Sequence, residues 1–111
     1  MRVGAIATVS LGQARYGPRS ELEVVARVDG APRATLEVVW RAEALGTATV
    51  RAPEEYVVHS AVIDGGSESI VRCRLPRTPL SYKGRLFQVS WWVRVRVDGE
   101  AEVNEFPFVV G

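Results

Sequence analysis

The chain has 111 residues and carries 14 Lys+Arg against 13 Asp+Glu, so its net charge is close to zero. This length predicts one domain, residues 1–111, whose hydrophobic core needs no metal or disulfide in order to fold. The balanced charge argues against a protein that binds nucleic acid by neutralising phosphates, and the single cysteine, Cys73, excludes an intramolecular disulfide.

The N-terminal segment, residues 2–11, predicts a first strand because small apolar side chains occupy every second position. The same segment resembles a short signal peptide, but its apolar stretch is at the lower limit for one. We therefore expect a strand and a cytoplasmic protein. No apolar run approaches the ~20 residues that span a bilayer, so no membrane partner is expected.

The next two predicted strands, residues 21–29 and 33–43, alternate cleanly between apolar and polar side chains. The apolar faces carry Leu22, Val24, Ala26 and Val28 in the first strand, and Ala34, Leu36, Val38, Trp40 and Ala42 in the second. Between them, Asp29-Gly30 followed by Ala31-Pro32 is typical of a hairpin-type turn.

The middle of the chain is less regular. Residues 47–51 are compatible with a short strand, which Pro53 interrupts. Residues 55–63 are apolar on both faces, which suits a strand that switches between sheets or is buried on both sides. A turn at Asp64-Gly65-Gly66 separates them from a further strand, residues 68–75.

The longest alternating pattern covers residues 86–97 and has Trp92 as the one large apolar side chain on its polar face. Asp98-Gly99 predicts a hairpin turn into the last strand, residues 101–110. In that strand the apolar phase changes near Asn104, which suggests a β-bulge.

Seven to eight short strands separated by turn signals predict an all-β protein, an immunoglobulin-like antiparallel β-sandwich. Trp40 and Trp91 fall on its inward faces, in strands that would be neighbours if the connectivity is immunoglobulin-like. Two buried indoles would fill a large share of a core this small.

The segment before and along the long strand resembles the arrestin-fold family, which has a similar stretch near the end of its amino-terminal sandwich. The similar residues are Cys73-Arg74-Leu75-Pro76, Pro79-Leu80-Ser81-Tyr82-Lys83-Gly84, and Val89 to Val95. The resemblance implies an arrestin-type sandwich in a prokaryote-like, single-domain form, because full arrestins have two sandwiches and this chain has room for one. The family's Pro-Pro-x-Tyr motif is absent, and neither receptor binding nor phosphate sensing carries over.

The residues that could support catalysis form no recognisable constellation. His59 is the only histidine and has no cysteine or acidic cluster near it in the sequence. Cys73 falls on a predicted inward face, and Ser60, His59 and Asp64 are a triple of the kind that any sequence offers. We therefore expect no enzyme, and no catalytic, cofactor or metal site.

Four arginines, Arg72, Arg74, Arg94 and Arg96, make up a possible basic face. Together with Trp92 they could stack nucleic-acid bases, or they could be solvated residues that pair across strands with Glu37 and Glu43; the neutral total charge favours pairing.

We expect Val39 beside Trp92 across the sheet, and Trp92 either marks a protein interface or is covered by a loop. We expect a binding or scaffold module for a protein partner or a second copy, with a homodimer possible. The contact would use Trp92, Arg94, Arg96 and Val39, or an open sheet edge. The alternative is a ligand- or nucleic-acid-binding sandwich that uses the same Arg/Trp face.

Overall fold

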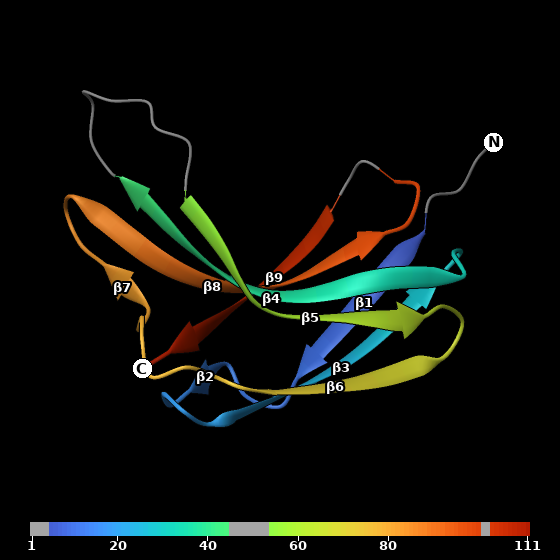
Figure 1. Ribbon diagram of the computed structural model, residues 1–111, viewed down its shortest axis with the longest axis horizontal. Coiled ribbons are helices and arrows are strands. Elements are labelled where there is room, and N and C mark those ends of the chain that lie inside the picture. Colours follow the sequence, from blue (N-terminus) through green and yellow to red (C-terminus); the bar gives the residue numbers. More distant parts are fainter. Residues whose placement is uncertain (1–4, 45–53, 101–102) are drawn as a thin grey trace.

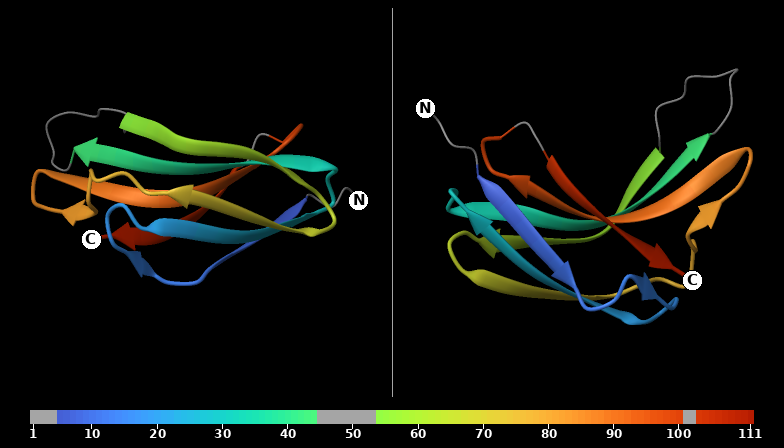
Figure 2. Two further views of the ribbon diagram at one scale, coloured as in Figure 1. Left: turned by 60° about the horizontal axis from the view of Figure 1, so that its bottom comes forward. Right: turned by 180° about the vertical axis from the view of Figure 1, so that it is seen from behind.

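The computed structural model describes residues 5–44, 54–100 and 103–111, and these ranges contain β-strands without any helix. They therefore hold no helix that is long and apolar enough to cross a membrane. The strands form two sheets that pack face to face (Figures 1 and 2).

Sheet 1 of the described residues has the strand order β1-β3-β6, with β1 (Ile6–Leu11), β3 (Glu21–Asp29) and β6 (Glu68–Arg74). Sheet 2 has the order β2-β9-β8-β4-β5, with β2 (Arg15–Tyr16), β9 (Val103–Val110), β8 (Phe87–Val97), β4 (Arg33–Ala44) and β5 (Glu54–Asp64). A short strand, β7 (Tyr82–Lys83), pairs with the start of β8. All pairs are antiparallel except β2 with β9. The predicted all-β sandwich is confirmed, with β2 and β7 as strands that the sequence did not predict.

The core lies between the two sheets and consists of the alternating apolar residues. Sheet 1 contributes Leu22, Val24, Ala26 and Val28, and sheet 2 contributes mainly Leu36, Val38, Trp91, Val93 and Val95; all of these are buried. Trp40 and Trp91 lie on neighbouring strands, as predicted, and are directly opposite each other in the β4–β8 register; Trp91 has no exposed area.

The connections between sheets differ from the prediction at residues 29–32. The predicted hairpin is wrong, because β3 belongs to sheet 1 and β4 to sheet 2, so this turn crosses between the layers. It lies against another connection between the sheets, from β5 to β6. The Gly65 N–H donates to the Pro32 carbonyl oxygen (2.8 Å), and the Gly66 N–H donates to the Val28 carbonyl oxygen (2.7 Å). These bonds hold both crossings together at one corner of the sandwich.

The prediction of a β-bulge near Asn104 is also wrong, since residues 103–108 contain none. The β8–β9 register runs without a shift from Arg96 opposite Val103 to Trp91 opposite Phe108. Val103 thus points to the outer face of sheet 2, as Arg96 does. The apolar phase changes because an apolar residue sits on the outer face, not because a residue is inserted.

Strand β5 corrects a third prediction. It is the end strand of sheet 2 rather than a strand that is buried on both sides or switches sheets, and along its length only Ile63 is buried. The register between β4 and β5 passes from Val38 opposite His59 to Val39 opposite Val57, so Val58 is an extra residue, a β-bulge. The possible strand at residues 47–51 lies outside the described residues.

Sheet 2 extends further than sheet 1 at one end. Figure 1 shows β4, β5 and β8 continuing past the ends of β3 and β6, and the view from behind in Figure 2 shows the same. The inner face of sheet 2 therefore has no opposing sheet at this end. Four aromatic residues there, Trp40, Tyr56, Tyr82 and Phe87, are called the aromatic overhang below.

Candidate protein-binding surfaces

Trp91 and Trp92 point to opposite faces of sheet 2, as the period of a strand requires. The Trp91 indole N–H donates to the Pro79 carbonyl oxygen (3.0 Å) inside the fold. Trp92 is half-buried on the outer face, where its indole N–H donates to Ser90 Oγ (2.8 Å). The Arg41 guanidinium carbon lies 5.3 Å from the centroid of the Trp92 ring, a cation–π contact. The predicted opposite orientation is confirmed.

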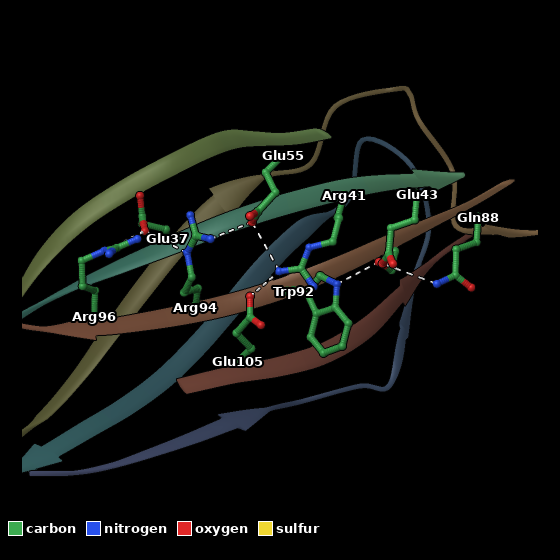
Figure 3. Close-up of polar contacts among 10 residues, drawn as sticks. Glu37, Arg41, Glu43, Glu55, Gln88, Trp92, Arg94, Arg96 and Glu105 are labelled. Carbon is green, nitrogen blue, oxygen red and sulfur yellow. Dashed lines mark hydrogen bonds and ion pairs between the residues drawn. The ribbon is translucent and has the colours of Figure 1, made fainter. Parts of the chain in front are cut away.

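The outer face beside Trp92 is an ion-pair network that joins β4, β5, β8 and β9 (Figure 3). Arg94 donates to Glu37 from Nε (3.1 Å) and to Glu55 from Nη1 (2.7 Å). Arg41 donates from Nη2 to Glu55 (3.3 Å) and to Glu105 (2.6 Å). Each guanidinium thus lies between two carboxylates, and little free positive charge remains on this face.

The network shifts the ionisation of two of its members. Burial alone would raise the pKa of Glu55, but hydrogen bonds and charges from Arg41 and Arg94 outweigh burial and lower it below the ordinary value. Burial alone would lower the pKa of Arg41, but Glu105 and Glu55 outweigh it and raise the pKa. Glu55 therefore stays ionised to a lower pH than a free glutamate, and it links the end strand β5 to the centre of the sheet.

The predicted interface residues differ widely in exposure. Arg96 is exposed and Trp92 is half-buried, whereas Arg94 is 9% exposed and Val39 has no exposed area. Val39 lies between Trp92 of β8 and Val57 of β5 in the register. Arg94 and Val39 are thus not the exposed residues that the alternation of the strands suggested. Binding of a partner through this face stays a prediction, and the side chains that could contact the partner directly are Arg96 and Trp92.

The four arginines do not form one basic face. Arg72 and Arg74 lie on sheet 1, where Arg72 pairs with Glu23 (2.9 Å) and Arg74 donates to the Arg19 carbonyl oxygen (3.1 Å). Arg94 and Arg96 lie on sheet 2.

The predicted pairing of the basic face with acidic neighbours is confirmed for one of the two glutamates. Glu37 accepts from Arg94, whereas Glu43 accepts from Gln88 (3.5 Å). Cross-strand pairing therefore explains most of the charge on the outer face.

The free edge of β5 is a second candidate surface, which we call the β5 edge. β5 has 11 residues, and among the described residues only β4 pairs with it. None of the backbone hydrogen bonds found outside the sheet ladders in the described ranges reaches β5. Residues 56–63 contain no charged residue and no proline, and Val62 is 69% exposed. A long, uncharged edge strand is a template for pairing with another chain.

The other edges of the sandwich carry features that discourage such pairing. β9 contains Pro107, which has no N–H to donate to an added strand. β6 carries the charged residues Glu68, Arg72 and Arg74, and β1 has only six residues. Strand β5 has the bulge at Val58, and its charged residues, Glu54, Glu55 and Asp64, lie only at its two ends. Residues 56–63 are therefore the most open edge in the described structure.

The aromatic overhang is a third surface, which sequence reasoning missed. Trp40 and Tyr56 stack with ring centroids 4.2 Å apart, and Tyr82 lies 4.8 Å from Phe87. Tyr56, Tyr82 and Phe87 are each about half exposed, at 46%, 51% and 49%. Alternation assigned Trp40 to an inward face, but it could not show that sheet 1 ends before it covers Trp40 and the aromatic residues beside it. Exposed apolar clusters of this kind often mark interaction sites.

The residues considered for catalysis are not assembled into a site. Ser60 and His59 are consecutive in β5 and so point to opposite faces of the sheet. Cys73 is half-buried opposite Leu22, and burial raises the pKa of its thiol. Within residues 5–44, 54–100 and 103–111, no three His, Cys, Asp or Glu side chains gather as they would around a metal ion.

Comparison with known proteins identifies the fold. No protein-family model and no curated protein matches the chain. Among solved structures, the chain is similar to Spo0M, a sporulation control protein from Bacillus subtilis, with a TM-score of 0.61 and 18% identity. The match covers 97% of this chain and 50% of Spo0M, so the chain spans half the length of that protein. The described structure is therefore an arrestin-like β-sandwich, which confirms the fold implied by the sequence resemblance.

Two β-glucosidases are similar over a small part of their length. The enzyme from Listeria innocua in complex with isofagomine matches with a TM-score of 0.49 and 18% identity, over 97% of this chain and 16% of the enzyme. EmGH1 from Erythrobacter marinus matches with a TM-score of 0.49 and 14% identity, over 97% of this chain and 15% of the enzyme. A likeness this limited carries no argument about activity.

Proposed function

We propose that this arrestin-like sandwich is a non-enzymatic protein-binding module that works by strand addition at the β5 edge, with self-association as its simplest form. The observation that carries the proposal is the 11-residue end strand with an uncharged, proline-free stretch at residues 56–63. An added strand would gain backbone hydrogen bonds from this edge and side-chain contacts with Val57 and Val62.

The β5 edge supports the proposal better than the face around Trp92. On that face Arg41 and Arg94 already bind carboxylates, so a partner would have to compete with existing ion pairs or meet a nearly neutral surface. The β5 edge has no internal partner in the described structure. The aromatic overhang adjoins it through Tyr56 and supplies the apolar area that protein interfaces favour.

The finer classification belongs to the same proposal. We infer a prokaryote-like member of the arrestin fold that acts in the cytoplasm, where a lone thiol such as Cys73 stays reduced.

Sedimentation velocity over a range of concentrations tests the proposal. Val62→Lys places a charge on an exposed side chain of the β5 edge, and we expect it to raise the dissociation constant of self-association at least tenfold. Ile6→Lys is the matched control, because Ile6 is 62% exposed on β1 of the other sheet. Trp92→Ala tests the face around Trp92 in the same assay.

The outcomes separate the surfaces. Loss of self-association in the Val62 variant alone supports the β5 edge, and loss in the Trp92 variant alone supports the sheet face instead. A wild-type protein that stays monomeric at every concentration would remove self-association from the proposal.

A specific feature also favours a second function, binding of an anionic ligand. A groove of about 460 Å³ lies beside Ser90, and the charged side chains that line it are Arg15 and Lys83, with no carboxylate side chain among them. A nucleic acid held there or on the Arg/Trp face would give a gel shift that weakens steeply with salt. The β5 edge proposal expects no shift with oligonucleotides at any salt concentration.

A further inference from the structure

We infer that the β5 edge binds a second copy of this chain in one register, an antiparallel pair of β5 strands with its two-fold axis at Ala61. This inference rests on the proposed function and adds the partner and the geometry. It places Ala61 opposite Ala61 of the second copy, Ser60 opposite Val62, and His59 opposite Ile63.

The bulge at Val58 limits which part of β5 can pair. Before the bulge Tyr56 shares the inner face with Trp40, and after it His59 and Ala61 share the inner face with Val38 and Leu36. The even-numbered residue Tyr56 faces inward before Val58, whereas the odd-numbered residues His59 and Ala61 face inward after it. A two-fold pair keeps inner side chains beside inner side chains, so it cannot run in register across the bulge in both copies. The usable stretch is residues 59–64.

Charge gives a second reason to keep the pair within that stretch. Asp64 is exposed at one end of β5, and Glu54 and Glu55 lie at the other end. A pair centred on His59 would place Asp64 opposite Glu54 of the second copy, and like charges directly opposite each other are destabilising. A pair centred on Ala61 places Asp64 opposite Val58 and leaves both glutamates beyond the paired residues.

The register centred on Ala61 also uses the longest uncharged run. All of residues 59–63 pair in it, and none of them is an aspartate, glutamate, lysine or arginine. A centre at Val62 would instead bring Asp64 of each copy inside the paired stretch, and a centre at Ser60 would bring in Val58 at the bulge. The small side chain at the centre lets the two backbones approach without a clash on the inner face.

Disulfide cross-linking of the full chain measures the register directly. In a Cys73→Ala background, Ala61→Cys is expected to form a covalent dimer in a glutathione redox buffer. Directly opposite residues of an antiparallel pair have Cα atoms about 4.5–5.5 Å apart, within the range of a disulfide. Val62→Cys in the same background is the matched control, because its two copies would be separated by about 8 Å. We expect at least tenfold more dimer for Ala61→Cys on non-reducing gels.

The result distinguishes this inference from the proposed function. Equal cross-linking of both variants, or more dimer for Val62→Cys, overturns the register. If the Cys73→Ala parent still dimerises in sedimentation, the proposed function at the β5 edge stands even when the register is wrong. A parent that is dimeric and insensitive to Val62→Lys overturns the edge itself. Folding of each variant is checked by its circular dichroism, so that a lack of dimer is read only from folded protein.

Discussion

Gly65 occupies the point where the β3–β4 and β5–β6 connections meet. A Cβ atom at this position would overlap the Ala31 carbonyl oxygen, a backbone atom that cannot rotate away. The hydrogen bond from the Gly65 N–H to Pro32 holds the two turns at this distance. Glycine is therefore required here by close approach of the backbone rather than by its φ angle.

We expect Gly65→Ala to lower the free energy of unfolding by about 2 kcal/mol or more, because the corner must open and strain its hydrogen bonds. Urea unfolding followed by tryptophan fluorescence measures the change. Gly12→Ala is the control, since a Cβ at Gly12 meets no atom within 4 Å, and its effect should stay within about 0.5 kcal/mol. Equal effects of both substitutions would contradict the role of the corner.

Single residues also show what the sequence could and could not predict. The opposite orientations of Trp91 and Trp92 follow from the period of a strand and needed no structure. The burial of Arg94 and Val39 depends on which strands lie beside them: Glu55 and Val57 come from β5, and Glu105 of β9 is opposite Arg94. Local alternation assigns a residue to a face, but only the strand order decides how well its neighbours cover it.

Among the elements, β5 is held to the rest of sheet 2 in part by the carboxylate of Glu55, which pairs with Arg41 and Arg94. Folding lowers the pKa of Glu55, so its stabilising contribution is present above the ordinary glutamate value of about 4.3 and is lost as pH falls through the lower folded value. The side chain is 38% exposed, so solvent screens part of the interaction.

Replacing this carboxylate should therefore reduce stability and flatten its acid dependence. We expect Glu55→Gln to lower the free energy of unfolding at pH 7 by about 1 kcal/mol and to weaken the fall in stability below about pH 4.5. Urea unfolding between pH 3 and pH 7 tests this. Glu68→Gln, an exposed site on β6, serves as the control, and an unchanged pH profile in the Glu55 variant would refute the assignment.

Most strand positions could be predicted, whereas their places in the sheets could not. Residues 21–29 match β3 in full, and the other predicted strands within the described ranges overlap the observed ones closely. Two errors come from apolar residues on exposed faces: β5 looked doubly buried because it is apolar on both faces, and in β9 the outward Val103 looked like an inserted residue. The third, the hairpin at residues 29–32, arose because a turn between strands does not show whether they join one sheet. An apolar residue on an exposed face has the same sequence signature as a buried one.

At the scale of the molecule, hydrogen bonding is uneven across sheet 2. β8 pairs with β4 along one side and with β7 and β9 along the other, whereas β5 pairs with β4 alone. Backbone amides that face an open edge exchange with solvent more readily than those held in a ladder.

We therefore expect the fastest-exchanging amides of residues 59–63 to exchange at least tenfold faster than those of residues 91–97 in dilute protein. Raising the protein concentration should slow exchange in residues 59–63 and leave residues 91–97 unchanged. Hydrogen exchange read by mass spectrometry or NMR gives both values. Protection of β5 equal to that of β8 at every concentration would mean that its edge is already covered.

The proline of β9 limits how large an assembly of this chain can become. Pro107 has no N–H to donate, so the β9 side of sheet 2 cannot pair with an added strand as the β5 side can. A symmetric pair joined through β5 therefore has no second edge of the same kind for a third molecule. Growth would be self-limiting, with a stoichiometry of two rather than an open-ended fibre.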